Sequence, residues 1–148
     1  MPHLSLNSVW LYYEVHGSGF PIILFHGGDG NSASWHKQAP VYAQHFQVII
    51  FDERGYGRSS APPTDYGGHT SANDILCLME ALEISRAFLV GYSMGAATAM
   101  RLALLAPSRV AAMVLSGAGS RWTISDGFRH RLVQSLTWAA RRQPSTTK

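Results

Sequence analysis

The sequence predicts an α/β fold built on a mostly parallel, doubly wound sheet. Three observations support this prediction: short apolar runs alternate with helical patterns, the later runs are apolar at nearly every position, and turn-forming residues separate the segments. Continuously apolar strands are typical of parallel sheets that are covered on both faces. A chain of 148 residues with 46% apolar composition is long enough to bury one core, and disorder is excluded.

Six segments are expected to form strands. The first two flank Asn7-Ser8, where we expect a hairpin turn, and the second is rich in Val, Trp and Tyr. The last four are apolar almost throughout, so we expect them to be buried on both faces. In chain order the predicted strands are residues 3–6, 9–15, 21–25, 47–51, 87–91 and 110–116.

Helical patterns fill the gaps between the later strands. Pro40 interrupts the first pattern and is expected to begin a second short helix. Ser71 with Asp74 three residues later predicts a capping box at the start of the second pattern, and Pro107 ends the third. The predicted helical segments are residues 35–45, 71–82 and 94–106.

The strongest functional motif is Gly91-Tyr92-Ser93-Met94-Gly95, which fits G-x-S-x-G between a predicted strand and a predicted helix. A serine on such a sharp turn has strained backbone, and side chains larger than hydrogen two residues away would collide with the turn. Glycine at Gly91 and Gly95 meets this requirement. The helix that follows favours negative charge near Ser93. The alternative is an ordinary tight turn whose serine caps a helix.

A second motif, His26-Gly27-Gly28-Asp29-Gly30, follows the third predicted strand. Its glycines allow main-chain N–H groups to converge on one oxygen, as an oxyanion site requires. In an acyl-transfer site the two donors would be the amides of Met94 and Gly28. We expect His26 to form structural hydrogen bonds in this loop. The alternative interpretation is a flexible glycine turn.

A third glycine-containing loop covers residues 52–60, where we expect Asp52 and Arg54 to form a local ion pair. The chain contains neither G-x-G-x-x-G nor a loop ending in G-K-[ST], so the sequence does not indicate dinucleotide or phosphate binding. Paired cysteines and H-E-x-x-H are absent from the sequence, and we expect neither a metal nor a cofactor.

These three motifs, in this order and spacing, resemble the amino-terminal half of the α/β-hydrolase superfamily over about residues 8–120. The resemblance implies that Ser93 is the nucleophile and that Met94 and Gly28 supply the oxyanion-hole amides. Serine at this position argues against the dehalogenase and epoxide hydrolase branches, which use aspartate there. The serine branch includes esterases, lactonases and haloperoxidase-like enzymes, so the expected substrate is a small ester, lactone or amide.

The same resemblance implies a triad acid and base after two further strands, which we do not find. Asp126 and His130 are the candidates downstream, and nothing in the pattern directs them toward Ser93. We therefore expect a hydrolase sheet truncated after the sixth strand. The expected organisation is a hydrolase part over residues 1–120, followed by a lid-like helix and a basic, disordered tail over residues 121–148.

Charge and cysteine content limit the remaining functions. Residues 121–148 hold six basic residues and one acidic residue, whereas residues 1–120 hold six basic and eight acidic residues, so the net charge of +3 comes from the tail. We expect no nucleic-acid partner, and no apolar stretch is long enough for a membrane span. The single Cys77 fits a cytoplasmic location. The hypothesis from another class is a non-catalytic interaction protein that binds, or self-associates, through the sixth-strand edge or the basic tail.

Overall fold

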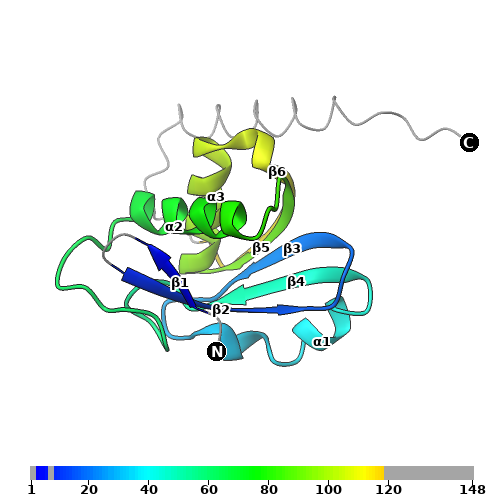
Figure 1. The fold of residues 1–148 in the computed structure, drawn as a ribbon, viewed down its shortest axis with the longest axis horizontal. Coiled ribbons are helices and arrows are strands. Elements are labelled where there is room, and N and C mark those ends of the chain that lie inside the picture. The colour runs from blue at the N-terminus through cyan, green and yellow to red at the C-terminus, as the bar shows by residue number, and fades with distance from the viewer. Residues whose placement is uncertain (1–2, 7–8, 119–148) are drawn as a thin grey trace, which may run out of the picture.

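The computed structural model describes residues 3–6 and 9–118, which form one six-stranded sheet with helices on both faces (Figure 1). The strand order is β1-β2-β4-β3-β5-β6. The strands are β1 (His3–Leu6), β2 (Val9–His16), β3 (Phe20–Phe25), β4 (Phe46–Phe51), β5 (Ala87–Tyr92) and β6 (Val110–Ser116). All six predicted strands are confirmed, with bounds that differ by at most one residue.

Strands β4, β3, β5 and β6 run parallel, while β1 and β2 pair antiparallel at the other end of the sheet. The carboxyl ends of parallel strands meet at one edge of a sheet, where reactive loops gather in open α/β folds. The loops that follow β3, β4 and β5 therefore lie together, and these loops carry the three motifs.

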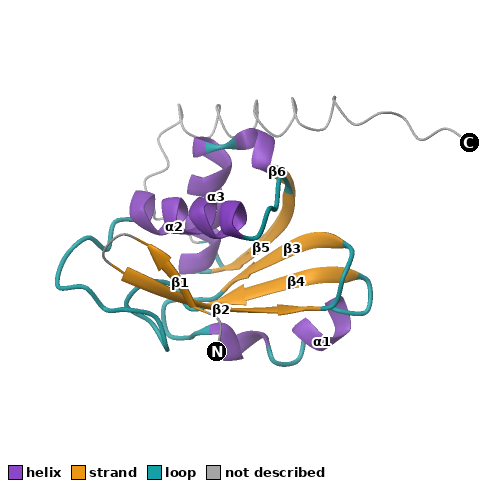
Figure 2. Cartoon of the chain, in the orientation of Figure 1, coloured by secondary structure: helices purple, strands orange, loops and turns teal. Residues whose placement is uncertain are grey.

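Two helices cover one face of the sheet and one short helix covers part of the other (Figure 2). The face under α2 and α3 is called the α2/α3 face below, and the opposite one the α1 face. The helical elements are η1 (Ser32–Trp35), α1 (Ala39–Tyr42), α2 (Gly68–Ala81), α3 (Met94–Leu105) and η2 (Pro107–Arg109). None of the helices within the described residues is long and apolar enough to cross a membrane.

The helix starts differ from the prediction in two places. The first pattern forms a 3-10 turn before α1, and Pro40 is the second residue of α1. The capping box was wrong: α2 begins after Gly67, and Ser71 and Asp74 lie buried inside the helix. Asp74 instead accepts two hydrogen bonds of 2.6 Å from the Arg54 guanidinium, so it pairs with the β4 loop and does not cap its own helix.

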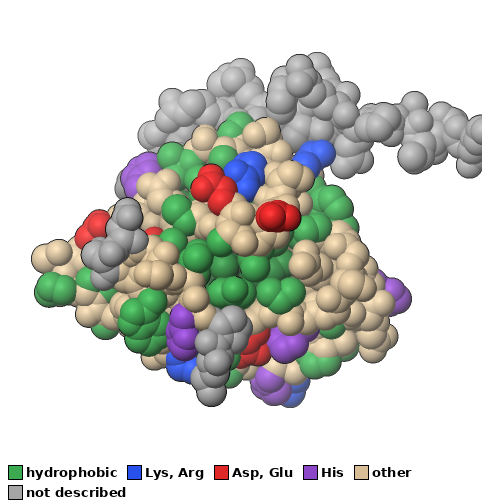
Figure 3. Space-filling model, in the orientation of Figure 1, with side chains coloured by type: hydrophobic (Ala, Val, Ile, Leu, Met, Phe, Trp, Pro, Cys, Tyr) green, Lys and Arg blue, Asp and Glu red, His purple; other side chains and the backbone are tan. Residues whose placement is uncertain are grey.

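The larger hydrophobic cluster lies on the α2/α3 face and includes Phe25 and Phe51, whose rings meet edge to face at 5.2 Å. A smaller cluster lies under α1. Figure 3 shows hydrophobic side chains gathered between α2 and the strands beneath it. The expectation that the sixth strand is buried on both faces was wrong, because β6 alternates and Val114 is 65% exposed.

Candidate active site

Ser93 occupies a sharp turn between β5 and α3, where the G-x-S-x-G motif places it. Its backbone has φ 52° and ψ −115°, in the region where non-glycine residues are strained by about 1–3 kcal/mol. Two hydrogen bonds hold the turn: the Ser93 N–H donates to the Ser116 carbonyl at 2.8 Å, and the Ala97 N–H donates to the Ser93 carbonyl at 3.2 Å. The strain is therefore fixed by β6 on one side and by α3 on the other.

The two glycines of the motif are required by close backbone contacts. A Cβ atom on Gly91 would lie 2.7 Å from the Ala96 Cα, and one on Gly95 would overlap the carbonyl oxygens of Phe25 and His26. Because these neighbours are main-chain atoms, they cannot move aside as a flexible side chain would. The strand, the turn and the first turn of α3 can pack this closely only without side chains at these two positions.

The loop after β3 lies against the start of α3. A Cβ on Gly28 would be 3.5 Å from the Met94 Sδ atom, which places this loop in contact with the first residue of α3. The Tyr56 hydroxyl donates to the same sulfur at 3.3 Å, and Gly27 packs against the Tyr92 ring. The structure thus brings together the segments that carry the two predicted donor amides, Met94 and Gly28.

His26 is fully buried at the start of this loop. Its Nε2 accepts the Glu53 N–H at 3.0 Å, so its Nδ1 carries the proton and donates to the Gly27 carbonyl at 2.7 Å. Burial lowers the pKa of His26, which keeps the ring neutral, although the hydrogen bond to Gly27 acts in the opposite direction. Both ring nitrogens are occupied by main-chain groups, an arrangement that suits a structural role.

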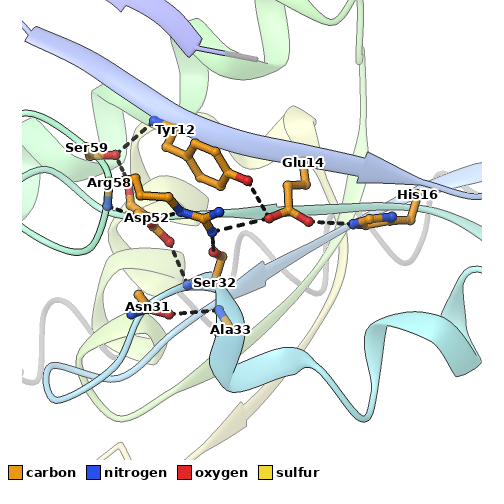
Figure 4. A network of polar contacts seen from close by, with 9 residues as sticks. All are labelled: Tyr12, Glu14, His16, Asn31, Ser32, Ala33, Asp52, Arg58 and Ser59. Atoms are coloured by element: carbon orange, nitrogen blue, oxygen red, sulfur yellow. Dashed lines mark hydrogen bonds and ion pairs between the residues drawn. The ribbon is translucent and has the colours of Figure 1, made fainter. Parts of the chain in front are cut away.

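A polar network on the α1 face holds the third loop (Figure 4). The predicted ion pair between Asp52 and Arg54 was wrong, because Asp52 accepts hydrogen bonds from the main-chain N–H groups of Ser32 at 2.7 Å and Arg58 at 2.8 Å. The Arg58 guanidinium lies 3.5 Å from the centre of the Tyr12 ring. Burial opposes the Asp52 charge, but the hydrogen bonds from Ser32 and Arg58 outweigh it and hold the pKa of Asp52 below its ordinary value.

A cavity of about 530 Å³ opens beside the glycine loop on the α1 face. Gly27, Trp35, Tyr92, Val114 and Ser116 are among its lining residues, whereas Ser93 is not. Cavities of this size commonly hold small molecules. The cavity therefore adjoins the turn that carries Ser93 without reaching the Ser93 side chain.

No acid or base contacts the Ser93 hydroxyl within residues 3–6 and 9–118. His16 pairs with Glu14 at 2.9 Å and His36 bonds the Ala33 carbonyl, so both rings face other parts of the molecule. The candidates Asp126 and His130 lie outside the described residues. No group of three potential metal-ligating side chains occurs in the described part of the chain.

Glu53 is the residue of this region that the sequence interpretation missed. It is 3% exposed, and it lies directly after Asp52 at the end of β4. The available signal in the sequence was a charged residue that closely follows an apolar strand, with no turn-forming glycine or proline between them. That signal predicts burial, but it does not reveal which side chains surround the carboxyl group.

The fold and the Ser93 turn define a class of protein, the α/β hydrolases, and comparison with known proteins agrees. The family model described as the alpha/beta hydrolase fold matches residues 21–143. The chain therefore belongs to the alpha/beta hydrolase fold family, as the three motifs predicted.

Several of the matched proteins are named as hydrolases or degrading enzymes. RutD of Azorhizobium caulinodans, which is named "putative carbamate hydrolase", is 34% identical over 88% of this chain and 48% of its own length. Est816, an N-acyl homoserine lactone degrading enzyme, has a TM-score of 0.76 and 33% identity over 91% of this chain and 54% of Est816. The epoxide hydrolase CorEH has a TM-score of 0.75 and 28% identity over 77% of this chain and 40% of CorEH. The chain spans about half the length of these proteins, or less.

Proposed function

We propose that this chain carries the nucleophile and the oxyanion hole of a serine hydrolase that cleaves small esters, lactones or amides. The observation that carries the proposal is the strained Ser93 turn, with φ 52°, packed between Gly91 and Gly95 and facing the glycine loop across Met94. A serine that needs such costly backbone is best explained by chemistry, because an ordinary helix cap requires no strain of this kind.

In the proposed reaction the Ser93 Oγ atom gives its proton to the base of the triad and attacks the substrate carbonyl carbon. The C–O or C–N bond of the substrate then breaks, the alcohol or amine leaves with that proton, and water hydrolyses the acyl-enzyme to the acid and free Ser93. The amides of Met94 and Gly28 would donate hydrogen bonds to the oxyanion as it forms. Removal of one such donor lowers turnover by about 10²–10³ in enzymes of this kind. The proposed steps use side-chain and main-chain groups and need no cofactor.

The base and acid of the triad are not assigned. The Ser93 hydroxyl needs a histidine within hydrogen-bond reach, held by a carboxylate. Asp126 and His130 are the candidates within this chain, and without that pair we expect Ser93 to react slowly. Residual acceleration of roughly 10³–10⁴ over water persists in serine hydrolases that lose triad members, provided that the oxyanion hole and substrate binding remain.

Serine at the turn separates this proposal from the epoxide hydrolases. CorEH and Est816 match the chain with nearly equal TM-scores, so similarity of fold does not decide the reaction. Ser93 stands where the epoxide-opening branch is expected to have aspartate, and this residue favours acyl transfer. The lactone-degrading activity in the name of Est816 lies within the same chemistry. For the setting of this reaction we propose the cytoplasm, where the single Cys77 would stay reduced.

Labelling with a fluorophosphonate probe tests the proposal, because the probe reports an activated serine without knowledge of the substrate. We expect labelling that is lost in Ser93→Ala and kept in Ser108→Ala, since Ser108 is exposed on η2. Absence of labelling in the unmodified chain, or equal labelling in Ser93→Ala, would refute an activated Ser93. Hydrolysis of p-nitrophenyl acetate by the same three proteins gives an independent measurement.

A second candidate function is self-association through β6. Within the described residues β6 ends the sheet, and Val114 on this strand is 65% exposed. A free strand edge with an apolar side chain favours pairing between chains. Size-exclusion chromatography with light scattering would show dimers that Val114→Lys dissociates; a monomer at all concentrations would contradict this function.

A further inference from the structure

Glu53 has a buried carboxyl group that the proposed reaction does not use. Its side chain enters the α2/α3 face, where Oε2 lies 3.4 Å from the Thr98 hydroxyl on α3. The other oxygen, Oε1, is buried and has no hydrogen-bond partner among the described residues. A buried polar atom without a partner is rare in folded proteins and calls for an explanation.

The Thr98 hydroxyl has two acceptors at the same distance. It lies 3.4 Å from Glu53 Oε2 and 3.4 Å from the Met94 carbonyl oxygen, one helical turn earlier. A hydroxyl has one proton to donate, so a strong bond to one acceptor weakens the bond to the other. Met94 is the first residue of α3 and carries one of the two proposed oxyanion amides. The acceptor that the Thr98 hydroxyl bonds therefore affects the first turn of the helix.

The main chain of Glu53 connects to the other oxyanion segment. Its N–H donates to His26 Nε2 at 3.0 Å, and His26 Nδ1 donates to the Gly27 carbonyl at 2.7 Å. Gly27 precedes Gly28, the second proposed donor. Glu53 therefore contacts, through one intermediate residue on each side, both segments that would bind the oxyanion.

The surroundings of the carboxyl group explain why its charge is finely balanced. Burial is the main cause and raises the pKa of Glu53 to about 7, and the charge of Asp74 acts in the same direction. The hydroxyls of Thr98 and Ser71 and the charge of Arg101 oppose this shift.

The groups that face Glu53 come from three elements: Ser71 and Asp74 from α2, Thr98 and Arg101 from α3, and the neutral His26 after β3. Asp74 is itself paired with Arg54 at 2.6 Å.

We propose that Glu53 is a positioning residue for the oxyanion hole, and that loss or gain of its proton moves the Thr98 hydrogen bond between the Glu53 carboxylate and the Met94 carbonyl. When Glu53 is ionised, its carboxylate is the stronger acceptor and attracts the Thr98 proton. When Glu53 takes a proton from solvent, it becomes the weaker acceptor, and the hydroxyl bonds the Met94 carbonyl. The oxyanion role in this inference depends on the proposed function, whereas the exchange of hydrogen bonds does not.

Nuclear magnetic resonance on the isotopically labelled chain tests the exchange directly. Between about pH 5 and pH 9 the side-chain carboxyl carbon of Glu53 reports its ionisation, and the amides of Gly95 and Gly28 report the two segments. The Gly95 amide shares a peptide unit with the Met94 carbonyl, so it responds to the Thr98 hydrogen bond. We expect the Glu53 carbon and the Gly95 amide to titrate with one common midpoint near neutral pH.

Variants distinguish the exchange from a general effect of pH. Thr98→Val removes the hydroxyl at nearly constant shape and should abolish most of the Gly95 titration while Glu53 still titrates; Thr98→Ser restores the hydroxyl and should restore the response. Glu53→Gln should remove the common midpoint, and the exposed Glu83→Gln should not. A Gly95 amide that ignores the Glu53 titration, or one that responds equally in Thr98→Val, would overturn the proposal. These outcomes do not require that Glu53→Gln folds.

The role in the reaction has a separate readout. If Ser93 reacts with the fluorophosphonate probe, the labelling rate of the unmodified chain should change through the midpoint of Glu53, and Thr98→Val should flatten that part of the pH profile. If the labelling rate of Thr98→Val still changes through the midpoint of Glu53, the positioning role is overturned. An unreactive Ser93 with a common midpoint for Glu53 and Gly95 would refute the proposed function and leave the exchange of hydrogen bonds standing.

Discussion

Asp52 and Glu53 are neighbours in the sequence, and both are buried after the end of β4. They lie on opposite faces of the sheet, and their pKa values shift in opposite directions. Asp52 lies on the α1 face, where main-chain N–H groups of Ser32 and Arg58 donate to its two oxygens and lower its pKa. Glu53 lies on the α2/α3 face, where burial raises its pKa and one oxygen has no partner. The comparison shows that the donors decide whether the cost of burial is overcome: they outweigh it at Asp52, whereas the hydroxyls near Glu53 do not.

The α2/α3 face does satisfy one charged pair, and breaking it should have the largest effect on stability. Arg54→Ala leaves Asp74 buried without its partner, since Arg54 donates to both carboxylate oxygens at 2.6 Å. Removal of one partner of a buried ion pair costs about 3–5 kcal/mol. We expect the free energy of unfolding, measured in urea, to fall by that amount. Arg86→Ala, at a partly buried surface position, is the control and should cost far less.

The α1 face depends on the Asp52 charge, so Asp52→Asn should have the next largest effect. The asparagine side chain would place its NH₂ group against an N–H donor that now bonds a carboxylate oxygen. We expect the free energy of unfolding to fall by about 2–4 kcal/mol at neutral pH. Because the folded pKa of Asp52 is depressed, its contribution is present above its unfolded pKa of about 4 and is lost as pH falls through the folded value. A difference between the two proteins that does not shrink in acid would contradict this account.

Glu53→Gln should have the smallest effect and the opposite sign. The raised folded pKa makes ionisation unfavourable for the fold, so the cost is absent below about pH 4.5, grows as pH rises, and is complete above about pH 7. Replacement by the neutral amide should raise the free energy of unfolding at pH 8 by about 1–2 kcal/mol and leave it little changed at pH 4. Unfolding in urea at the two pH values measures this. Equal effects at both pH values would show that the pKa of Glu53 is not raised in the fold.

The strands were predictable from the sequence because their apolar runs end at charged or turn-forming residues. The Gly91 and Gly95 positions were predictable for a similar reason, since a motif of fixed spacing encodes a single local backbone. One error concerns the start of a helix, and others concern partners that are distant in the sequence. Ser71 looked like a helix cap because the pattern before it gave no sign that α2 starts earlier, at Gly68.

Polar pairings followed contacts that no local pattern contains. Arg54 was expected to bond Asp52, two residues away, but Asp52 is occupied by Ser32 and Arg58, and Arg54 turns to Asp74 on the opposite face. Glu53 was missed for the same reason. Its role depends on Thr98, 45 residues later, and on the distance between the two side chains.

The hydrogen bond from the Ser93 N–H to the Ser116 carbonyl also sets a lower limit on the length of any engineered fragment of this fold. A segment that stops before Ser116 keeps the motif and the helix that follows it but loses the outer support of the turn. Relaxation of Ser93 to an ordinary backbone conformation would then lower the free energy of the fragment. Minimal scaffolds that aim to display this serine should therefore be cut after β6, even though β6 contributes no residue to the G-x-S-x-G motif.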